Sequence, residues 1–155
     1  MIRFDKKKLS AQTALIHKTE FRVGFQDVDA AGIVFFARFF DYAHLAYEEF
    51  LRGAGCELSR ILAQKEWAAP LRHAEADYLL PLRFGDLLSI RLVAAHVEES
   101  EITFAWLIVR VGSVVEEAVE ERVSAIVQTV HTYVTLPDFK RCPVPQAIVD
   151  KLGAS

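Results

Sequence analysis

Two aspartates near the start of the chain have a spacing that suggests chemistry. Asp27 and Asp29 lie in the stretch QDVDAAGIVFFARFFDY, directly before a run that is almost wholly apolar. An aspartate with the usual pKa of about 3.9 is ionised at neutral pH, so it can act as a nucleophile or general base without a helper. The same acids also fit a helix cap or a solvated turn. On these residues alone both interpretations stay open.

The other reactive residue types form no competing motif. Cys56 and Cys142 are far apart in the sequence, so we expect two free thiols in a reducing compartment. No serine lies in a nucleophile-elbow motif. His73, His96 and His131 lack metal-ligand spacing, and we interpret them as structural residues. We therefore expect no metal site and no cofactor.

Composition excludes several classes of protein. A length of 155 residues indicates one domain, spanning residues 1–155. The net charge of −3 argues against nucleic-acid binding. No apolar run approaches the roughly 18 residues of a membrane span, and the N-terminus does not resemble a signal peptide, so we expect a cytoplasmic protein. The hydrophobic fraction of 52% favours a homo-oligomer, because it exceeds what one small subunit needs to bury.

Hydrophobic periodicity predicts the elements that position the two acids. A long apolar helix is expected over residues 35–51, where apolar side chains recur with a 3.6-residue period. A shorter helix is expected over residues 58–64, and residues 1–14 are polar and expected to be loosely held. Alternating segments predict strands at residues 15–25, 71–80, 87–97, 101–111 and 114–136. The simplest arrangement is an α+β fold in which a curved antiparallel sheet wraps around the central helix.

Three segments together resemble a known family. The stretch FQDVDAAGIVFFARFF, the helix YAHLAYEEFL and the later ADYLLPLRFGDLLSIRL resemble the hot-dog-fold acyl-CoA thioesterases. Within them, the chain is most similar to the branch that contains 4-hydroxybenzoyl-CoA and 1,4-dihydroxy-2-naphthoyl-CoA thioesterases. The resemblance covers about residues 18–145. It implies a hot-dog fold, an acyl-CoA substrate, and a dimer or homotetramer with active sites between subunits.

The resemblance also assigns roles at the motif. Asp29 matches the catalytic acid, which attacks the thioester carbonyl or activates a water molecule. The backbone N–H of Phe36 matches the donor that holds the carbonyl oxygen, at the positive end of the helix dipole. Gly32 belongs to the same motif and is counted with the substrate-binding residues. Some branches carry a tyrosine and a histidine where Phe25 and Phe36 stand, which disfavours the histidine-dependent branch here. Asp27 is expected to order the turn.

Further residues are expected to bind the substrate. His44 lies on a helix face with Phe40 and Tyr47, where it can hydrogen-bond a phenolic oxygen in an aryl pocket, although a core or interface histidine fits nearly as well. The phosphates of CoA need cations. We prefer Lys140 and Arg141, a basic pair before CPVP at the end of the last strand, over the other candidates Arg83, Arg91 and Arg110.

The expected function is hydrolysis of an aromatic acyl-CoA of the 1,4-dihydroxy-2-naphthoyl or 4-hydroxybenzoyl type to the free acid and CoA. CoA is then part of the substrate and not a cofactor. Two alternatives stay open: a thioesterase for short or medium-chain aliphatic acyl-CoA, and a non-catalytic acyl-binding protein. A dehydratase on the same fold is disfavoured, because Phe36 replaces the histidine that it needs.

Overall fold

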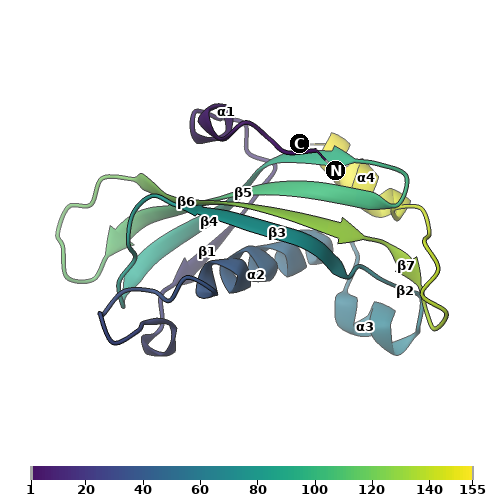
Figure 1. The fold of residues 1–155 in the computed structure, drawn as a ribbon, viewed down its shortest axis with the longest axis horizontal. Coiled ribbons are helices and arrows are strands. Elements are labelled where there is room, and N and C mark those ends of the chain that lie inside the picture. Colours follow the sequence, from purple (N-terminus) through teal and green to yellow (C-terminus); the bar gives the residue numbers. More distant parts are fainter. Residues whose placement is uncertain (1, 155) are drawn as a thin grey trace.

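A curved antiparallel sheet wraps around one long helix. The computed structural model describes residues 2–154, and its main sheet has the strand order β1-β4-β5-β6-β3. The helix α2 (Arg38–Gly53) lies along the concave face of this sheet (Figure 1). The α+β hot-dog arrangement expected from the sequence is confirmed. The strands are β1 (His17–Arg22), β3 (Leu71–Tyr78), β4 (Asp86–Val97), β5 (Glu101–Ser113) and β6 (Arg122–Thr132).

The apolar face of α2 forms the core against the sheet. Phe39, Ala43, Ala46, Tyr47 and Phe50 are each at most 3% exposed, and they follow the helical period that the sequence predicts. The helix begins at residue 38, three residues later than expected, because residue 35 donates its N–H to the preceding loop and the chain turns before entering the helix.

The last predicted strand is wrong over its first third. Residues 114–121 form a loop, and β6 begins only at residue 122. This loop carries four glutamates, and its valines Val114 and Val115 are 59% and 82% exposed, so the segment packs little apolar surface against the core. The chain also leaves the main sheet after residue 132. There the short strand β7 (Val134–Thr135) pairs with β2 (Trp67–Ala68) in a separate two-stranded sheet.

The N-terminal segment is not loosely held as a whole. Residues 6–10 form the helix α1 (Lys6–Ser10), which lies on the face of the sheet opposite α2 (Figure 1). Leu9 is 4% exposed, and the N–H of Phe4 donates to Oε1 of Gln128 at 2.9 Å. Met1 lies outside the described residues.

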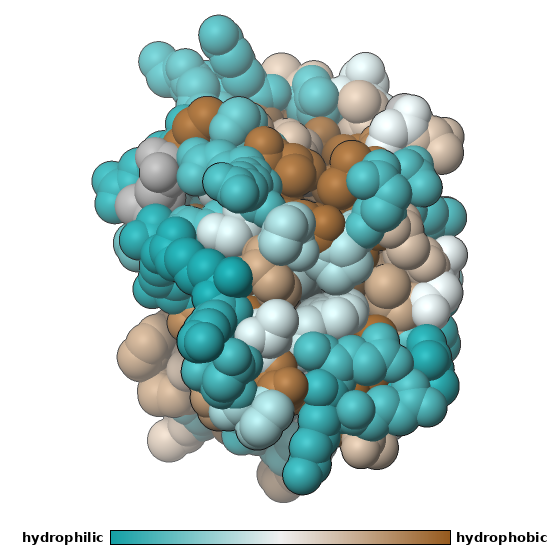
Figure 2. Space-filling model, turned by 90° about the vertical axis from the view of Figure 1, so that its right-hand side faces the viewer, coloured by the Kyte–Doolittle hydropathy of each residue, from teal (hydrophilic) through white to brown (hydrophobic). Residues whose placement is uncertain are grey.

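Two short helices complete the fold, and both thiols are free. The helix α3 (Leu58–Ala63) matches the shorter helix expected there, and α4 (Gln146–Gly153) follows the proline-rich tail. Cys56 and Cys142 are unpaired, as predicted. Within residues 2–154, every helix is too short or too polar to cross a bilayer. The end of the molecule that carries β7 is covered mainly by hydrophilic residues, with smaller hydrophobic patches between them (Figure 2).

Candidate active site

The loop between β1 and α2 is braced by a buried carboxylate. Asp27 is 6% exposed, and its Oδ2 accepts hydrogen bonds from the Tyr42 hydroxyl at 2.9 Å and the Gly24 N–H at 3.3 Å. Its backbone carbonyl accepts from the N–H of Phe35 at 2.9 Å. Burial and the bond to Asp27 raise the pKa of Tyr42 well above its ordinary value. Asp27 therefore fixes both ends of the loop, and its predicted turn-ordering role is confirmed.

Only one of the two carboxylate oxygens of Asp29 has hydrogen-bond partners in the described chain. Oδ1 accepts from the N–H groups of Ala31 at 2.8 Å and Ile33 at 3.4 Å, which closes a tight turn. Oδ2 has no hydrogen-bond or ion-pair partner among residues 2–154. Gly32 has a φ of +78°, a conformation that favours glycine, and its N–H donates to the Asp29 carbonyl at 3.0 Å. The turn thus holds the carboxylate in place while one oxygen stays available.

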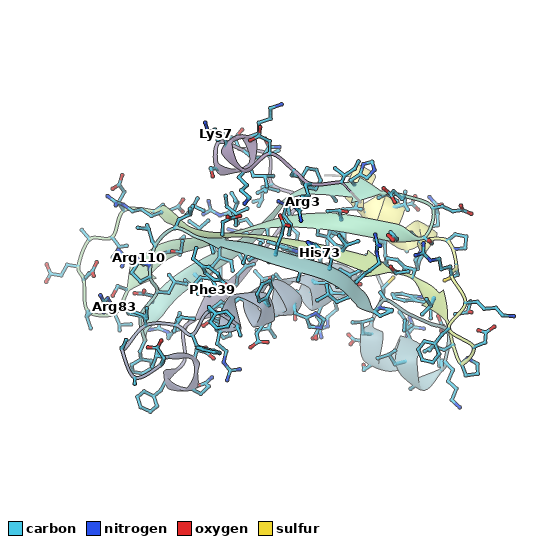
Figure 3. All side chains as sticks on the ribbon, viewed as in Figure 1. Arg3, Lys7, Phe39, His73, Arg83 and Arg110 are labelled. Carbon is cyan, nitrogen blue, oxygen red and sulfur yellow. The ribbon has the colours of Figure 1, made fainter. Side chains whose placement is uncertain are left out.

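This free oxygen borders an apolar pocket of about 430 Å³, which we call the aspartate pocket. Phe39 at the start of α2 forms part of its wall (Figure 3). The pocket lies between the Asp29 turn, the first turn of α2 and the end of β3. Gly32 is not among the lining residues, and the structure shows it as part of the turn, so its expected contact with substrate stays a prediction. The lining residues are Asp29, Ile33, Val34, Phe35, Phe36, Phe39, Tyr78, Leu79, Leu80 and Pro81.

Phe36 lines the same pocket and has an unused backbone donor. Its N–H has no acceptor within the part of the chain that the structure describes. Its carbonyl accepts a 2.9 Å hydrogen bond from the hydroxyl of Tyr78, whose ring contacts Phe39 edge-on at 5.0 Å. Sequence reasoning missed Tyr78. The strand periodicity that places alternate β3 side chains toward α2 was the available signal.

A second pocket, of about 210 Å³, lies further along α2, and we call it the histidine pocket. It brings together Phe40, His44 and Tyr47, the three predicted aryl-binding residues, but away from Asp29. The side chain of His44 is 55% exposed, and its Nε2 lies 3.3 Å from Oε1 of Glu48. The complete lining is Phe40, Asp41, Ala43, His44, Tyr47, Leu71, Thr129 and His131.

The two pockets lie at opposite ends of the same strand. Tyr78, at the end of β3, lines the aspartate pocket, and Leu71, at its start, lines the histidine pocket. β3 pairs with β6 and forms one edge of the main sheet. One described chain therefore contains the expected groups, but it divides them between two cavities.

The preferred cations lie elsewhere. Lys140 and Arg141 follow β7, which is at the opposite end of the molecule from the loop before α2 (Figure 1). Arg141 lies 3.8 Å from Glu101, and neither basic residue lines the aspartate or histidine pocket. Arg83, the candidate that sequence reasoning ranked lower, forms a β-bridge with Ile33 in the wall of the aspartate pocket and lies at that end (Figure 3).

The geometry defines a class of protein: a hot-dog fold with a carboxylate and a free N–H beside the N-terminus of the central helix. Residues 23–152 match the thioesterase-like superfamily, and the chain belongs to this family. A 1,4-dihydroxy-2-naphthoyl-CoA hydrolase from Acaryochloris marina is 32% identical over 127 residues, which cover 82% of this chain and 88% of the relative.

Two solved structures show the same architecture. A 1,4-dihydroxy-2-naphthoyl-CoA thioesterase from Synechocystis has a TM-score of 0.77 at 29% identity, covering 88% of this chain and 95% of that one. A gentisyl-coenzyme A thioesterase has a TM-score of 0.72 at 26% identity, covering 87% of this chain and 98% of that one. The similarity therefore extends over nearly the whole fold.

Proposed function

We propose that this protein hydrolyses an aromatic acyl-CoA thioester to the free acid and CoA. The observation that carries the proposal is that one apolar pocket is lined by both Asp29, which has a free oxygen, and Phe36, which has a free N–H among residues 2–154. The names of the relatives support the aromatic class, because 1,4-dihydroxy-2-naphthoyl and gentisyl both denote hydroxylated aromatic acyl groups.

The site has the two parts that thioester hydrolysis requires. The Phe36 N–H, one residue before the N-cap of α2, can donate to the carbonyl oxygen as negative charge develops on it. Oδ2 of Asp29 either attacks the carbonyl carbon or takes a proton from a water molecule that attacks it. In the first route the C–S bond breaks to give an anhydride between Asp29 and the acyl group, which water then hydrolyses to the acid and the Asp29 carboxylate. In the second route the attack of water breaks the C–S bond directly. In both, a proton released from that water protonates the CoA thiolate. No cofactor enters the reaction.

The two routes differ in where oxygen from water is incorporated. A single turnover in ¹⁸O-labelled water separates them. Label in the Asp29 carboxylate supports an anhydride intermediate, whereas label confined to the product acid supports direct attack by water.

A second copy of the chain can unite the two pockets. If the free edges of two β3 strands pair antiparallel about a two-fold axis, Tyr78 of one copy faces Leu71 of the other. The aspartate pocket of each subunit then adjoins the histidine pocket of its neighbour. Exposure along this edge favours such pairing, since Leu71 is 50%, Tyr78 45%, Leu79 50% and Phe36 59% exposed in the single chain.

The same pairing would bring cations toward the aspartate pocket. Antiparallel pairing turns the β7 end of one subunit, with Lys140 and Arg141, toward the Asp29 end of the other. Arg83 lies at that end in its own subunit, and its guanidinium has no ion-pair partner in the described chain. These residues are our candidates for the CoA phosphates. A homotetramer of two such dimers and a cytoplasmic location, where CoA thioesters are formed and consumed, belong to the same proposal.

Replacement of Asp29 by asparagine tests the reaction. The amide oxygen can still accept from the Ala31 N–H, so the turn is kept while the reactive carboxylate is lost. We expect kcat to fall at least about 100-fold for an aromatic thioester, measured as thiol release. Asp150→Asn on α4 is the matched control, and it should keep wild-type activity because, among residues 2–154, its carboxylate bonds only to Gln146.

The substrate panel separates the alternatives. It contains 1,4-dihydroxy-2-naphthoyl-, 4-hydroxybenzoyl-, benzoyl- and hexanoyl-CoA. A clear preference for an aromatic thioester supports the proposal, and a preference for hexanoyl-CoA favours the aliphatic thioesterase. Absence of turnover by the wild type, or full activity of Asp29→Asn, favours the alternative function of a non-catalytic acyl-binding protein.

Mixing two inactive variants tests the shared site. In His44→Trp the bulky indole fills the histidine pocket, and in Asp29→Asn the carboxylate is lost. If each site combines Asp29 of one subunit with the histidine pocket of the other, a mixed dimer has one site with both parts intact. If both parts come from the same subunit, a mixed dimer has no intact site. In the first case, random mixing in equal amounts should restore about a quarter of wild-type activity. A mixture that stays inactive would show that each site lies within one subunit.

A further inference from the structure

His131 on β6 is buried in the wall of the histidine pocket, although its sequence context suggested only a structural residue. It is 2% exposed, and its ring stacks on Tyr47 with centroids 4.1 Å apart and an interplanar angle of 17°. A second aromatic ring, that of Phe104, contacts it edge-on at 5.8 Å. These rings fix the plane of the imidazole, so its two nitrogens point in defined directions.

One nitrogen is committed to the backbone. Nδ1 of His131 lies 3.2 Å from the carbonyl oxygen of Ala69. A carbonyl oxygen can only accept, so this bond requires a hydrogen on Nδ1. In the neutral ring, Nε2 must then carry a lone pair and act as an acceptor.

The other nitrogen is open to the cavity. Nε2 has no hydrogen-bond partner among residues 2–154. In the described chain, the side-chain atoms that are both fully enclosed and without a partner are Ser124 Oγ and Thr132 Oγ1. Nε2 of His131 is not among them, so it is not fully enclosed by protein atoms. Since His131 lines the histidine pocket, Nε2 reaches its open space.

We propose that Nε2 of His131 accepts a hydrogen bond from a hydroxyl group of the substrate acyl chain, and that it thereby makes the histidine pocket selective for hydroxylated aromatic rings. This inference rests on the proposed thioesterase function and deepens it. Phe40 and Tyr47 supply apolar contact for the ring, and Nε2 is an acceptor in that wall. An unhydroxylated ring would leave this acceptor desolvated and unpaired, which costs binding free energy.

The charge state of His131 suits this role. The pKa of His131 is lowered to about 4, mainly by burial; the bond to Ala69 opposes this shift and the nearby His44 adds to it slightly. The ring is therefore neutral at physiological pH. His44 is a poorer candidate for the same contact, because its side chain is half exposed and its Nε2 already lies beside Glu48.

Matched pairs of substrates test the inference. One pair is 4-hydroxybenzoyl-CoA and benzoyl-CoA, and the other is 1,4-dihydroxy-2-naphthoyl-CoA and 1-hydroxy-2-naphthoyl-CoA. We expect the wild type to prefer the more hydroxylated member in at least one pair by about tenfold in kcat/KM. His131→Phe keeps a ring against Tyr47 but has no acceptor, so this preference should disappear while kcat/KM for the less hydroxylated member changes little. His73→Phe, on β3, is the control and should keep the wild-type preference.

The outcomes distinguish this inference from the proposed function. If the wild type hydrolyses none of the four thioesters, the proposed function fails. If it hydrolyses them but His131→Phe keeps the preference, or slows both members of a pair equally, the role of His131 is wrong.

A second measurement does not depend on His131→Phe folding. Long-range ¹H–¹⁵N spectra of Asp29→Asn should show the Nδ1–H tautomer of His131. The Nε2 resonance should shift when 4-hydroxybenzoyl-CoA binds and change little with benzoyl-CoA. The opposite tautomer, or equal shifts with both ligands, would overturn the inference.

Discussion

At the scale of single residues, the Asp29 carboxylate closes a turn and keeps one oxygen without a partner among residues 2–154, so its geometry is compatible with both the turn role and the proposed catalytic role. Oδ1 closes the turn with the Ala31 and Ile33 N–H groups, Oδ2 has no partner among residues 2–154, and Asp29 lines the aspartate pocket. A carboxylate has enough lone pairs to do both. The structure shows the turn contacts of Asp29, and its catalytic role stays a prediction. Tyr78 and His131 were not predictable in the same way, since their positions depend on long-range pairing, with Tyr78 opposite Ala125 and Leu71 opposite His131.

Tyr78 should affect catalysis through the turn that it holds. Its hydroxyl donates to the Phe36 carbonyl, so it positions the peptide next to the proposed oxyanion donor. We expect Tyr78→Phe to lower kcat about fivefold with little change in KM, because one hydrogen bond is worth about 1 kcal/mol. Steady-state thiol release gives both constants. Asp77→Asn, on the same strand but bonded to Lys6, is the control. Equal effects of the two variants would indicate a general disturbance of β3 instead.

Burial of neutral His131 predicts a pH dependence of stability. Its pKa is about 4 in the folded protein, against 6.5 for a histidine in water, so between pH 6.5 and 4 the unfolded chain binds more protons. The stability that goes with a neutral His131 is fully present above pH 6.5 and is lost as the pH falls to 4. The free energy of unfolding should decrease by up to about 3 kcal/mol over this window. Urea denaturation of wild type and His131→Phe at several pH values measures it. A slope that is unchanged in the variant would assign the loss to other groups, such as His17, whose pKa burial also lowers.

At the scale of elements, the loop between β1 and α2 determines where the reactive groups lie. The helical period predicted α2 well, because its apolar face is long and regular. The start of the helix was missed, since the bond from the Phe35 N–H to Asp27 is a tertiary contact that periodicity does not contain. The same limit applies to residues 114–121, where a strand was predicted and the charged segment forms a loop.

Within the loop between β1 and α2, adding a single methyl group at Gly32 should lower both stability and activity. Its φ of +78° disfavours any residue with a Cβ, although a Cβ there would meet no atom within 4 Å. We expect Gly32→Ala to lower the free energy of unfolding by about 1 kcal/mol and to reduce kcat, because the Asp29 turn must distort. Gly153→Ala also adds a methyl group in open space, but Gly153 does not have a positive φ, so this control should be neutral or slightly stabilising. Equal stability of both variants would mean that the turn adapts without strain.

At the scale of the whole molecule, the two faces of the sheet are covered differently. The concave face packs on α2, and the opposite face packs on α1 through a small apolar cluster that includes Leu9, Val93, Leu107 and Val109. Sequence reasoning missed α1, because a helix of five residues is not stable alone and only tertiary packing explains it. Ion pairs from Arg3 to Glu75 at 3.2 Å and Lys6 to Asp77 also connect this segment to β3. A dimer formed through the free edge of β3 would leave this cover in place.

Shortening Leu9 tests whether α1 is part of the stable fold. Leu9→Ala should lower the free energy of unfolding by about 2 kcal/mol, because it removes buried methyl groups and leaves a cavity between α1 and the sheet. Lys7→Ala on the same helix is the control, since Lys7 is exposed on the helix above the sheet (Figure 3), and its effect should stay within about 0.5 kcal/mol. Urea denaturation measures both variants, and thiol release should be unchanged because α1 and the active site lie on opposite faces of the sheet. If Leu9→Ala is no less stable than Lys7→Ala, α1 does not stay packed in solution and the outer face is free for another subunit.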